Sequence, residues 1–280
     1  MTKKILHGTI AINSNMNVLI TGGNGTIGKF LKETLSYNIF APSRNELDLA
    51  SADAVSKYFD ENKIDTVIHC ALTGRNDLFS KDPAFTTDSL WMFRNLWNNR
   101  HKFNKLINLG TAYELDLEQN NENIIETEFL NHLPSTSYGY AKNIITRIIH
   151  ETDKFYNLRL FGVFHEHEAD NRFFKKLYLN KGIEINNDIY LDYIYLGDVV
   201  PVINEIIENK VIYKDINMVY SHKFKLSELA NVFCIINNID PTNVVISGSK
   251  GNNLTGNSSR LEALNSRMLG LRRALALYQR

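Results

Sequence analysis

The stretch NVLITGGNGTIG at residues 17–28 decides how this chain folds. A short apolar run is followed by glycines in a GxxGxxG spacing, and the chain then continues into an amphipathic segment. Such glycines allow a tight turn, a close approach of the backbone to a pyrophosphate, and close packing of a helix on a strand. An isolated motif of this kind is more often an ordinary glycine-rich turn, but a strand before it and a helix after it favour a dinucleotide site. The residues predicted to form this site are Gly22, Gly25, Thr26, Ile27 and Gly28.

Short β-rich apolar runs alternate with amphipathic stretches through the first half of the chain. This alternation is typical of parallel strands joined by helical crossovers. Helices are expected at 26–36 and 138–154, where apolar residues recur at helical spacing. The fold class is therefore predicted to be α/β, a doubly wound parallel sheet of the Rossmann type. The expected strands are NVLIT (17–21), YNIFA (37–41), TVIHCA (66–71), KLINLG (105–110) and NLRLFGVF (157–164).

The regular alternation weakens after about residue 164, where charged and Asn-rich stretches interrupt shorter apolar runs. We interpret 16–164 as the dinucleotide-binding domain and 165–280 as mostly a smaller substrate-binding lobe. Part of that lobe, about 187–220, is expected to return to the Rossmann sheet. Residues 1–15 precede the first strand and are interpreted as a leader without an assigned role.

Charge and cysteine content restrict the classes of partner. The chain has 31 basic and 31 acidic residues, so no long-range field attracts nucleic acid or an anionic membrane, and a small-molecule ligand is favoured. No apolar run approaches the ~20 residues that cross a bilayer, and no signal peptide is evident. Cys70 and Cys234 lie far apart and outside any metal-ligand pattern, so neither a disulfide framework nor a metal site is predicted. A cytoplasmic location fits these features.

The end of the second expected strand bears on the choice of dinucleotide. In such folds an acidic residue there holds the ribose 2′-hydroxyl of NAD, whereas a basic residue accommodates the 2′-phosphate of NADP. Here the strand runs into Ala41-Pro42-Ser43-Arg44, with no carboxylate and a guanidinium suited to a bidentate phosphate contact. NADP(H) is favoured and NAD(H) stays open, because Arg44 could also be a solvated loop residue.

A tyrosine and a lysine in the segment SYGYAK form a candidate catalytic pair. Tyr138 and Lys142 are four residues apart at the start of an expected helix, which places them on one face, and Thr111 follows the fourth expected strand. Carboxyl ends of strands border the ligand crevice in a doubly wound sheet. Carbonyl reduction needs a proton donor, a positive charge that tunes it and a second hydroxyl, so Tyr138, Lys142 and Thr111 are assigned these roles. Tyr140 lacks a lysine four residues on.

Read together, these features resemble the NAD-dependent epimerase/dehydratase family, the extended short-chain dehydrogenases/reductases. The resemblance runs from Asn17 nearly to the end of the chain, and Thr111, Tyr138 and Lys142 match the family's catalytic Ser/Thr, Tyr and Lys. It implies that Asp48 and Leu49 flank adenine, that Ala71 lies along the cofactor, and that the protein is a homodimer. The motifs that carry it are TGGNGTIG (21–28), ELDL (46–49), HCA (69–71), LGT (109–111), YGYAK (138–142), LRLFGVF (158–164) and LDYIYLGDVV (191–200).

Within the family, RNELDL (44–49) and LGT resemble the nucleotide-sugar reductases that include GDP-fucose synthase, where the matching arginine meets the NADP phosphate. That branch also epimerises its sugar with a Cys and a His, but Tyr113 stands at the Cys position and the His position falls near Asn171 or Arg172. The dehydratases carry an Asp-Glu pair after the catalytic Thr, whereas Ala112 and Tyr113 follow here. Dehydration is therefore disfavoured, and the double epimerase-reductase reaction is less expected.

The resulting prediction is an NADP(H)-dependent reductase of a keto group, at C4, on a nucleotide-activated deoxysugar. A 4-epimerase with bound NAD uses the same three residues and is the enzymatic alternative, and a non-catalytic NADP-binding sensor of the same fold is the other. Tyr113, His165, Arg172 and Arg260 are the candidate substrate residues, the two arginines as partners for phosphate oxygens. Either arginine could equally be a surface charge, and for His165, a candidate acid-base group, a solvated polar loop is the favoured account.

Overall fold

A six-stranded parallel sheet forms the centre of the molecule. The computed structural model describes residues 16–72 and 81–279, so the predicted leader at 1–15 lies outside the described residues. The strand order is β10-β6-β4-β3-β1-β2, and every neighbouring pair is parallel. This confirms the predicted α/β doubly wound fold. The strands are β1 (Asn17–Thr21), β2 (Asn38–Phe40), β3 (Thr66–His69), β4 (Lys105–Thr111), β6 (Phe155–Leu160) and β10 (Asp215–Met218).

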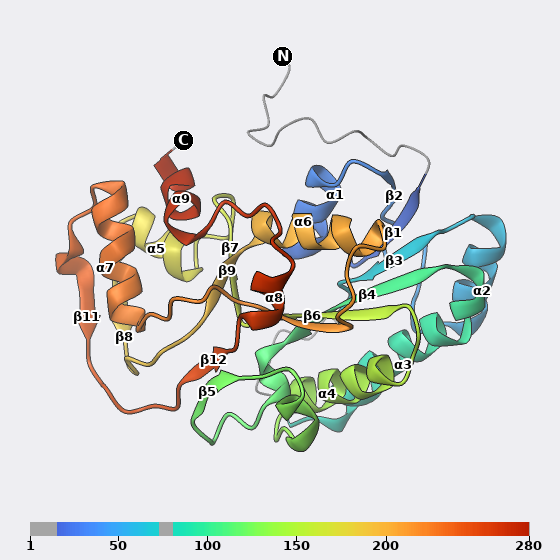
Figure 1. The fold of residues 1–280 in the computed structure, drawn as a ribbon, viewed down its shortest axis with the longest axis horizontal. Coiled ribbons are helices and arrows are strands. Elements are labelled where there is room, and N and C mark those ends of the chain that lie inside the picture. Colours follow the sequence, from blue (N-terminus) through green and yellow to red (C-terminus); the bar gives the residue numbers. More distant parts are fainter. Residues whose placement is uncertain (1–15, 73–80, 280) are drawn as a thin grey trace, which may run out of the picture.

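Helices cover both faces of this sheet (Figure 1). One face packs against α1 (Thr26–Thr34) and α6 (Leu196–Ile207), whose apolar residues share a core with alternate residues of β1, β4 and β6. The other face packs against α2 (Ala52–Glu61), α3 (Pro83–Asn98) and α4 (Ser137–His150). Apolar side chains on both faces explain why the strands read as nearly continuous hydrophobic runs.

The chain reverses its direction of winding at β1. From β1 it passes to β2 on one side, and the later strands β3, β4, β6 and β10 all lie on the other. In open α/β sheets, ligands bind beyond the carboxyl ends of the strands at this switch point. The glycine turn after β1 and the segment after β3 are therefore placed at the ligand crevice.

The expected strand 157–164 is wrong as a single element. The structure divides it at Phe161 into β6, which stays in the main sheet, and β7 (Gly162–Phe164), which pairs in parallel with β9 (Tyr193–Tyr195). The Gly162 amide donates to Asp192 O at 2.8 Å, and a Cβ at Gly162 would lie 2.6 Å from the Tyr193 ring. Because only glycine fits so close to that ring, the chain leaves the sheet at this point.

The expected helix 138–154 also differs, because α4 ends at His150. Lys154 adopts a left-handed backbone with φ of 63°, which a right-handed helix cannot include. The remaining short elements are 3₁₀ turns: η1 (Arg100–Lys102), η2 (Ala112–Glu114), η3 (Glu128–Asn131), η4 (Pro241–Asn243) and η5 (Ala276–Gln279).

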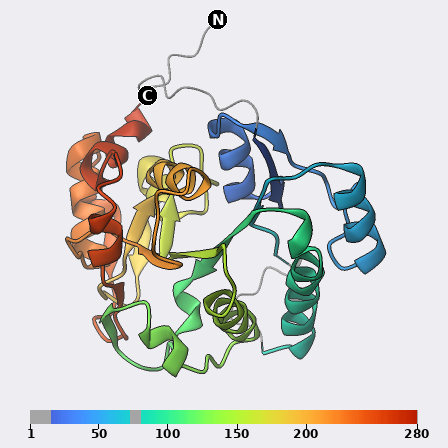
Figure 2. The same ribbon diagram turned by 45° about the vertical axis from the view of Figure 1, so that its right-hand side comes forward.

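A second group of elements lies beside the sheet (Figure 2). Its core joins α5 (Phe173–Tyr178), α7 (Leu226–Asn237) and α9 (Leu271–Leu275). The strand β8 (Ile183–Ile185) pairs with β11 (Val244–Ile246), and β5 (Asn121–Ile124) pairs with β12 (Leu254–Gly256), which precedes α8 (Ser259–Ala263). The β5 and β12 pair joins segments more than 120 residues apart. The domain boundary at residue 164 stays a prediction.

Two buried aspartates fasten this second group to the sheet. Asp192 accepts hydrogen bonds from Lys223 Nζ at 2.7 Å and from the Gly256 amide at 2.8 Å. Asp198, at the start of α6, accepts from the Tyr220 hydroxyl at 2.6 Å and from the Gly270 amide at 2.9 Å. These contacts join the segment 191–200 to β12 and to the turns before α7 and α9.

A buried histidine at the end of β3 links stability to pH. His69 is 1% exposed, and its Nδ1 lies 2.9 Å from the Thr21 hydroxyl. Burial, with a smaller effect of the Lys142 ammonium, lowers the pKa of His69 from 6.5 to about 3. Between pH 6.5 and about pH 3, the unfolded chain therefore binds a proton on His69 that the folded chain does not bind. The contribution of His69 to stability is present above pH 6.5 and is lost as the pH falls towards 3.

We expect His69 to lower the free energy of unfolding by about 2 kcal/mol between pH 7 and pH 5. Replacing His69 with Asn, an amide that does not titrate, should remove this part of the pH dependence. Denaturant unfolding of both proteins at the two pH values measures the difference. An equal loss in wild type and His69→Asn would show that another group is responsible.

Candidate active site

A cleft of about 480 Å³ lies at the glycine turn between β1 and α1. Gly22 has a φ of +70°, and a Cβ there would lie 2.8 Å from Ala71 Cα. A Cβ at Gly28 would lie 2.3 Å from Gly22 O, so this glycine lets α1 pack on the turn. The Gly25 amide donates to Gly22 O at 2.9 Å, and Gly25 caps α1 without a side chain. The helix N-terminus and the bare turn together suit an anionic group.

Most of the predicted cofactor residues line this first cleft. Gly22, Gly25, Arg44, Asp48, Leu49 and Ala71 lie on its wall. Arg44 follows β2, its side chain is 80% exposed, and its Nε is 3.9 Å from an Asp48 oxygen. Thr26 starts α1, Gly28 packs against Gly22, and Ile27 lines the neighbouring cleft instead. The placement of Arg44 leaves its guanidinium accessible to a ligand in the cleft.

A second cleft, of about 630 Å³, contains Thr111, Tyr138 and Lys142. It adjoins the first, because Leu72 lines both. Thr111 ends β4, and the other two residues lie in the first turns of α4. The Thr136 hydroxyl caps this helix by accepting from the Gly139 amide at 3.1 Å. The structure thus brings the three residues together from two separate elements, as the sequence predicted.

Tyr138 is packed between Phe85 and Tyr113, each with its ring centre 5.9 Å away. Burial raises the pKa of the phenol from 10.0 to about 12, although a hydrogen bond with the Thr111 side chain opposes the rise. Burial outweighs the effect of this hydrogen bond. At neutral pH the phenol is therefore protonated.

Lys142 is 6% exposed, and its ammonium donates to Leu109 O at 2.9 Å. Burial lowers the pKa of Lys142, while the negative charge of Glu114 raises it. The hydrogen bond to the β4 backbone fixes the ammonium at the base of the cleft. The nearby Cys70 lines the same cleft, and burial raises the pKa of its thiol to about 12.

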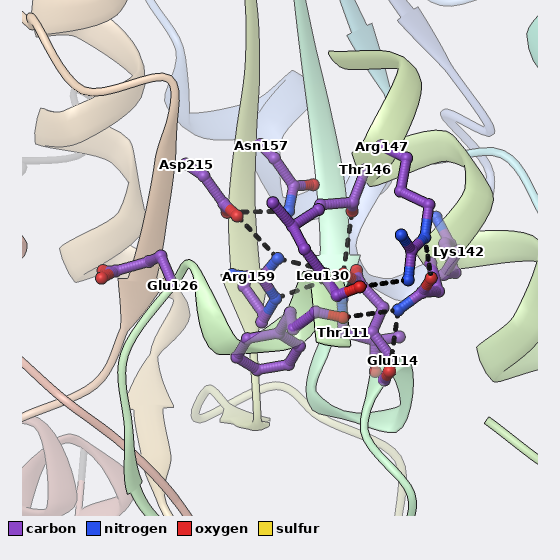
Figure 3. A network of polar contacts seen from close by, with 12 residues as sticks. Thr111, Glu114, Glu126, Leu130, Lys142, Thr146, Arg147, Asn157, Arg159 and Asp215 are labelled. Atoms are coloured by element: carbon purple, nitrogen blue, oxygen red, sulfur yellow. Dashed lines mark hydrogen bonds and ion pairs between the residues drawn. The ribbon is translucent and has the colours of Figure 1, made fainter. Parts of the chain in front are cut away.

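A buried ion network lies beneath these residues (Figure 3). Arg159 of β6 is 0% exposed, and its Nη2 lies 3.0 Å from Glu114 Oε2 and 2.7 Å from Asp215 Oδ2. The Arg159 guanidinium also lies 3.5 Å from the centre of the Phe129 ring. The sequence analysis missed this network. Its signal was an arginine inside the apolar run LRLF, because a charge in a buried strand requires partners.

Tyr113 and Arg172 are the two predicted substrate residues that line the second cleft. Burial raises the pKa of the Tyr113 phenol. Arg172 Nη2 donates to Val163 O at 2.9 Å, and its Nε lies 3.8 Å from a Glu168 oxygen. The Arg172 side chain is 47% exposed, so its remaining donors are open to a ligand.

His165 and Arg260, the other two predicted substrate residues, do not line either of these clefts, and their role stays a prediction. His165 is 6% exposed and packs against Phe30 with ring centres 5.3 Å apart. Burial lowers the pKa of His165. Arg260 donates to Asp215 O at 2.9 Å and pairs with Glu126 at 3.4 Å, so its guanidinium is used inside the fold.

Loop and strand residues from distant parts of the chain complete the second cleft, and sequence patterns did not assign them to the site. The residues concerned are Leu117, Asn121, Phe161, Asn187, Ile189, Leu191, Tyr193, Gly251, Asn252, Asn253 and Leu254. Among the described residues that line this cleft, none is a carboxylate, whereas Lys142 and Arg172 are cations. In the described part of the chain no cluster of metal-binding side chains is found, and no helix could span a membrane.

Comparisons with known proteins agree with this geometry. The model of the NAD dependent epimerase/dehydratase family matches residues 18–218. A search of curated protein sequences gave no match.

Three similar solved structures cover nearly the whole chain. MlghC, a GDP-mannoheptose C4 reductase from Campylobacter jejuni with NADP bound, has a TM-score of 0.75 and 20% identity over 95% of this chain and 97% of its own. A dTDP-4-dehydrorhamnose reductase from Bacillus anthracis in complex with NADP has a TM-score of 0.78 and 20% identity, with 94% and 97% covered. A GDP-L-fucose synthetase from Naegleria fowleri has a TM-score of 0.71 and 17% identity, with 95% and 93% covered.

At these identities the solved structures show a shared fold, and the family model gives the assignment because it extends over most of the chain. Its match begins within β1, before the glycine turn, and ends with β10, the edge strand of the main sheet. The glycine turn, Tyr138 and Lys142 all lie within the residues that the family model matches. The chain therefore belongs to the NAD dependent epimerase/dehydratase family.

Proposed function

We propose that this protein reduces a keto group, at C4, of a nucleotide-activated deoxysugar with NADPH. The observation that carries the proposal is the convergence of Thr111, Tyr138 and Lys142 in a cleft that adjoins the glycine-turn cleft. Support also comes from the similar structures, two of which are named as reductases and hold NADP.

The residues of the first cleft fit a dinucleotide with a 2′-phosphate. The start of α1, capped by Gly25 without a side chain, suits the pyrophosphate, and the family resemblance implies that Asp48 and Leu49 on the wall of this cleft flank adenine. Arg44 follows β2 at the position where NAD-dependent relatives carry a carboxylate. When bound, this cofactor supplies the hydride for the keto carbon.

Tyr138 is the proton donor in the proposed reaction. Its Oη gives a proton to the keto oxygen as the carbon is reduced, and the raised pKa keeps the phenol in the protonated form that this step needs. The Thr111 hydroxyl, hydrogen-bonded with Tyr138, orients the same oxygen. The Lys142 ammonium, fixed by Leu109 O, stabilises the phenolate that remains after the transfer.

The charge of the second cleft supports a nucleoside diphosphate as the part of the substrate that the protein binds. Two cations and no carboxylate line its described wall, so an anion gains from entering it. Arg172, with half of its side chain exposed, is the proposed partner of a phosphate oxygen. Phe161, Tyr113 and Tyr193 provide apolar faces against which a sugar or a base can pack.

The alternatives differ from this proposal in measurable ways. A 4-epimerase with bound NAD would interconvert two sugars without net loss of NADPH, and the exposed Arg44 speaks against NAD. A non-catalytic sensor would bind NADP without turnover, and the paired phenol and ammonium speak against it. Reductase, epimerase and sensor therefore give three distinct outcomes in one assay.

We also propose that the protein is a homodimer whose two copies meet at α3 and α4. These helices pack together and leave an apolar groove lined by Leu90, Trp91, Trp97, Ile144 and Ile148. Trp91 is 45% exposed, and Arg94 lies 4.6 Å from its ring centre. A contiguous exposed apolar patch of this kind is typical of an interface, and the family resemblance makes a second copy the occupant.

The two free thiols, Cys70 and Cys234, support a reducing cytoplasm as the location, which cell fractionation would test.

Replacing Tyr138 with Phe should lower the rate of NADPH oxidation by about 10²- to 10⁴-fold, because the proton donor is lost. The assay follows the absorbance of NADPH with dTDP- and GDP-linked 4-keto sugars. Tyr140→Phe is the matched control, since Tyr140 is exposed on the same helix and should keep the wild-type rate. The reductase assignment fails if wild type oxidises no NADPH or if Tyr138→Phe is as fast as wild type.

Replacing Arg44 with Ala should raise the dissociation constant of NADPH by about 10- to 100-fold, because a charge-assisted hydrogen bond to the phosphate is lost. NADH lacks the 2′-phosphate and should bind the variant as it binds wild type. Fluorescence titration of both cofactors measures the two dissociation constants. Equal weakening for NADPH and NADH would remove Arg44 from the phosphate site.

Light scattering should give a mass of twice 32.1 kDa for the wild-type protein. Trp91→Glu places a charge in the apolar groove and should give the monomer mass with the fold retained. A wild-type monomer, or a dimer that Trp91→Glu leaves intact, would contradict pairing through α3 and α4.

A further inference from the structure

The turn that carries Thr111 is closed by a carboxylate three residues on. The Thr111 amide donates to Glu114 Oε1 at 3.1 Å, and the Thr111 hydroxyl accepts from the Tyr113 amide at 3.3 Å. This reciprocal pair is a capping box at the start of η2. Glu114 thus holds the Thr111 backbone, and the Tyr113 amide holds the Thr111 side-chain oxygen.

The Glu114 carboxylate is in turn held by α4 and β6. The side chain is 0% exposed, and its Oε2 accepts from the Thr146 hydroxyl of α4 at 2.8 Å and from Arg159 Nη2 of β6 at 3.0 Å. Arg159 is balanced by Asp215 of β10 at 2.7 Å, and Asp215 lies 3.1 Å from His150 Nε2. A line of contacts therefore runs from three structural elements to the Thr111 turn (Figure 3).

The burial of these charged groups costs more free energy than filling the same space would require. Buried ion pairs are often no more stabilising than apolar side chains of the same volume, because both charges lose their hydration. Here an arginine and two carboxylates are buried at one point, and every one of them has several hydrogen bonds. Such a network is better explained by the geometry that it imposes on its neighbours.

We propose that Glu114, held by Arg159, is a positioning residue that fixes the Thr111 hydroxyl for the reduction. The inference rests on the proposed function, since it concerns how one of the three reacting-site residues is oriented. Glu114 does not line the second cleft, so it acts through Thr111 and touches no ligand there. Its charge also faces Lys142, whose pKa it raises against the effect of burial.

A double-mutant cycle of Glu114→Gln with Thr111→Ala tests this inference. The measured quantity is the single-turnover rate of NADPH oxidation with whichever dTDP- or GDP-linked 4-keto sugar the wild type reduces. Glu114→Gln keeps the shape of the side chain but removes its charge. It should slow the reaction by about 10- to 100-fold while the dissociation constant of NADPH stays unchanged, because a small displacement of a reacting group has this effect. In the Thr111→Ala background the same change should cost less than about threefold.

The matched control is Lys102→Gln, which breaks the ion pair with Asp60 and touches no member of the Arg159 network and neither cleft. Its effect on the rate should be small and equal in both backgrounds. If Glu114→Gln fails to fold, Thr146→Val removes one of the hydrogen bonds to Oε2 and should show a smaller loss with the same dependence on Thr111.

The outcomes distinguish the positioning role of Glu114 from the proposed reductase function. A loss from Glu114→Gln that is equally large with and without Thr111 would overturn the positioning role and leave the reductase intact. An unchanged rate in Thr111→Ala, or no NADPH oxidation by wild type, would overturn the proposed function and this inference with it.

Discussion

The contact on which the rest of this structure depends is the guanidinium of Arg159 between two buried carboxylates. One carboxylate belongs to the turn after β4 and the other to β10, while Arg159 itself lies in β6 between them in the sheet. An unpaired charge at this depth would be strongly destabilising, so each partner requires the others. These contacts join the three strands to one another and to the α4 helix. They thereby fix the floor of the second cleft.

The two clefts meet where the winding of the sheet reverses, and this explains how residues of unrelated sequence position share one site. Parallel strands end at the same edge, so the glycine turn after β1, Ala71 after β3 and Thr111 at the end of β4 face one crevice. Burial then acts differently on each group. It keeps the Tyr138 phenol protonated, and it lowers the pKa of Lys142, whose ammonium is held by a backbone carbonyl.

The parts of the fold that depend on local pattern were predictable from the sequence. The glycine turn, the parallel strands and the convergence of Thr111, Tyr138 and Lys142 follow from periodicity and from the rule that strand ends border the crevice. What failed depends on contacts between distant residues. The strand expected at 157–164 breaks at Phe161, because Gly162 and the residues after it pair with β9, whose Tyr193 ring packs against Gly162. The net direction of the Tyr138 pKa depends on Phe85 and Tyr113, which no spacing in the sequence reveals.

The pairing of β5 with β12 has a mechanical consequence. Strand β5 follows the Thr111 turn and strand β12 lies near the carboxyl end of the chain, so their ladder crosses from one side of the second cleft to the other. The Glu126 contacts with Arg260 and with the Asn217 amide reinforce the same crossing. Separation of β5 from β12 would have to break this ladder, the ion pair of Glu126 with Arg260 and the hydrogen bond from the Asn217 amide together. The ladder and these contacts therefore oppose any widening of the second cleft between β5 and β12, whose residues Asn121 and Leu254 line it.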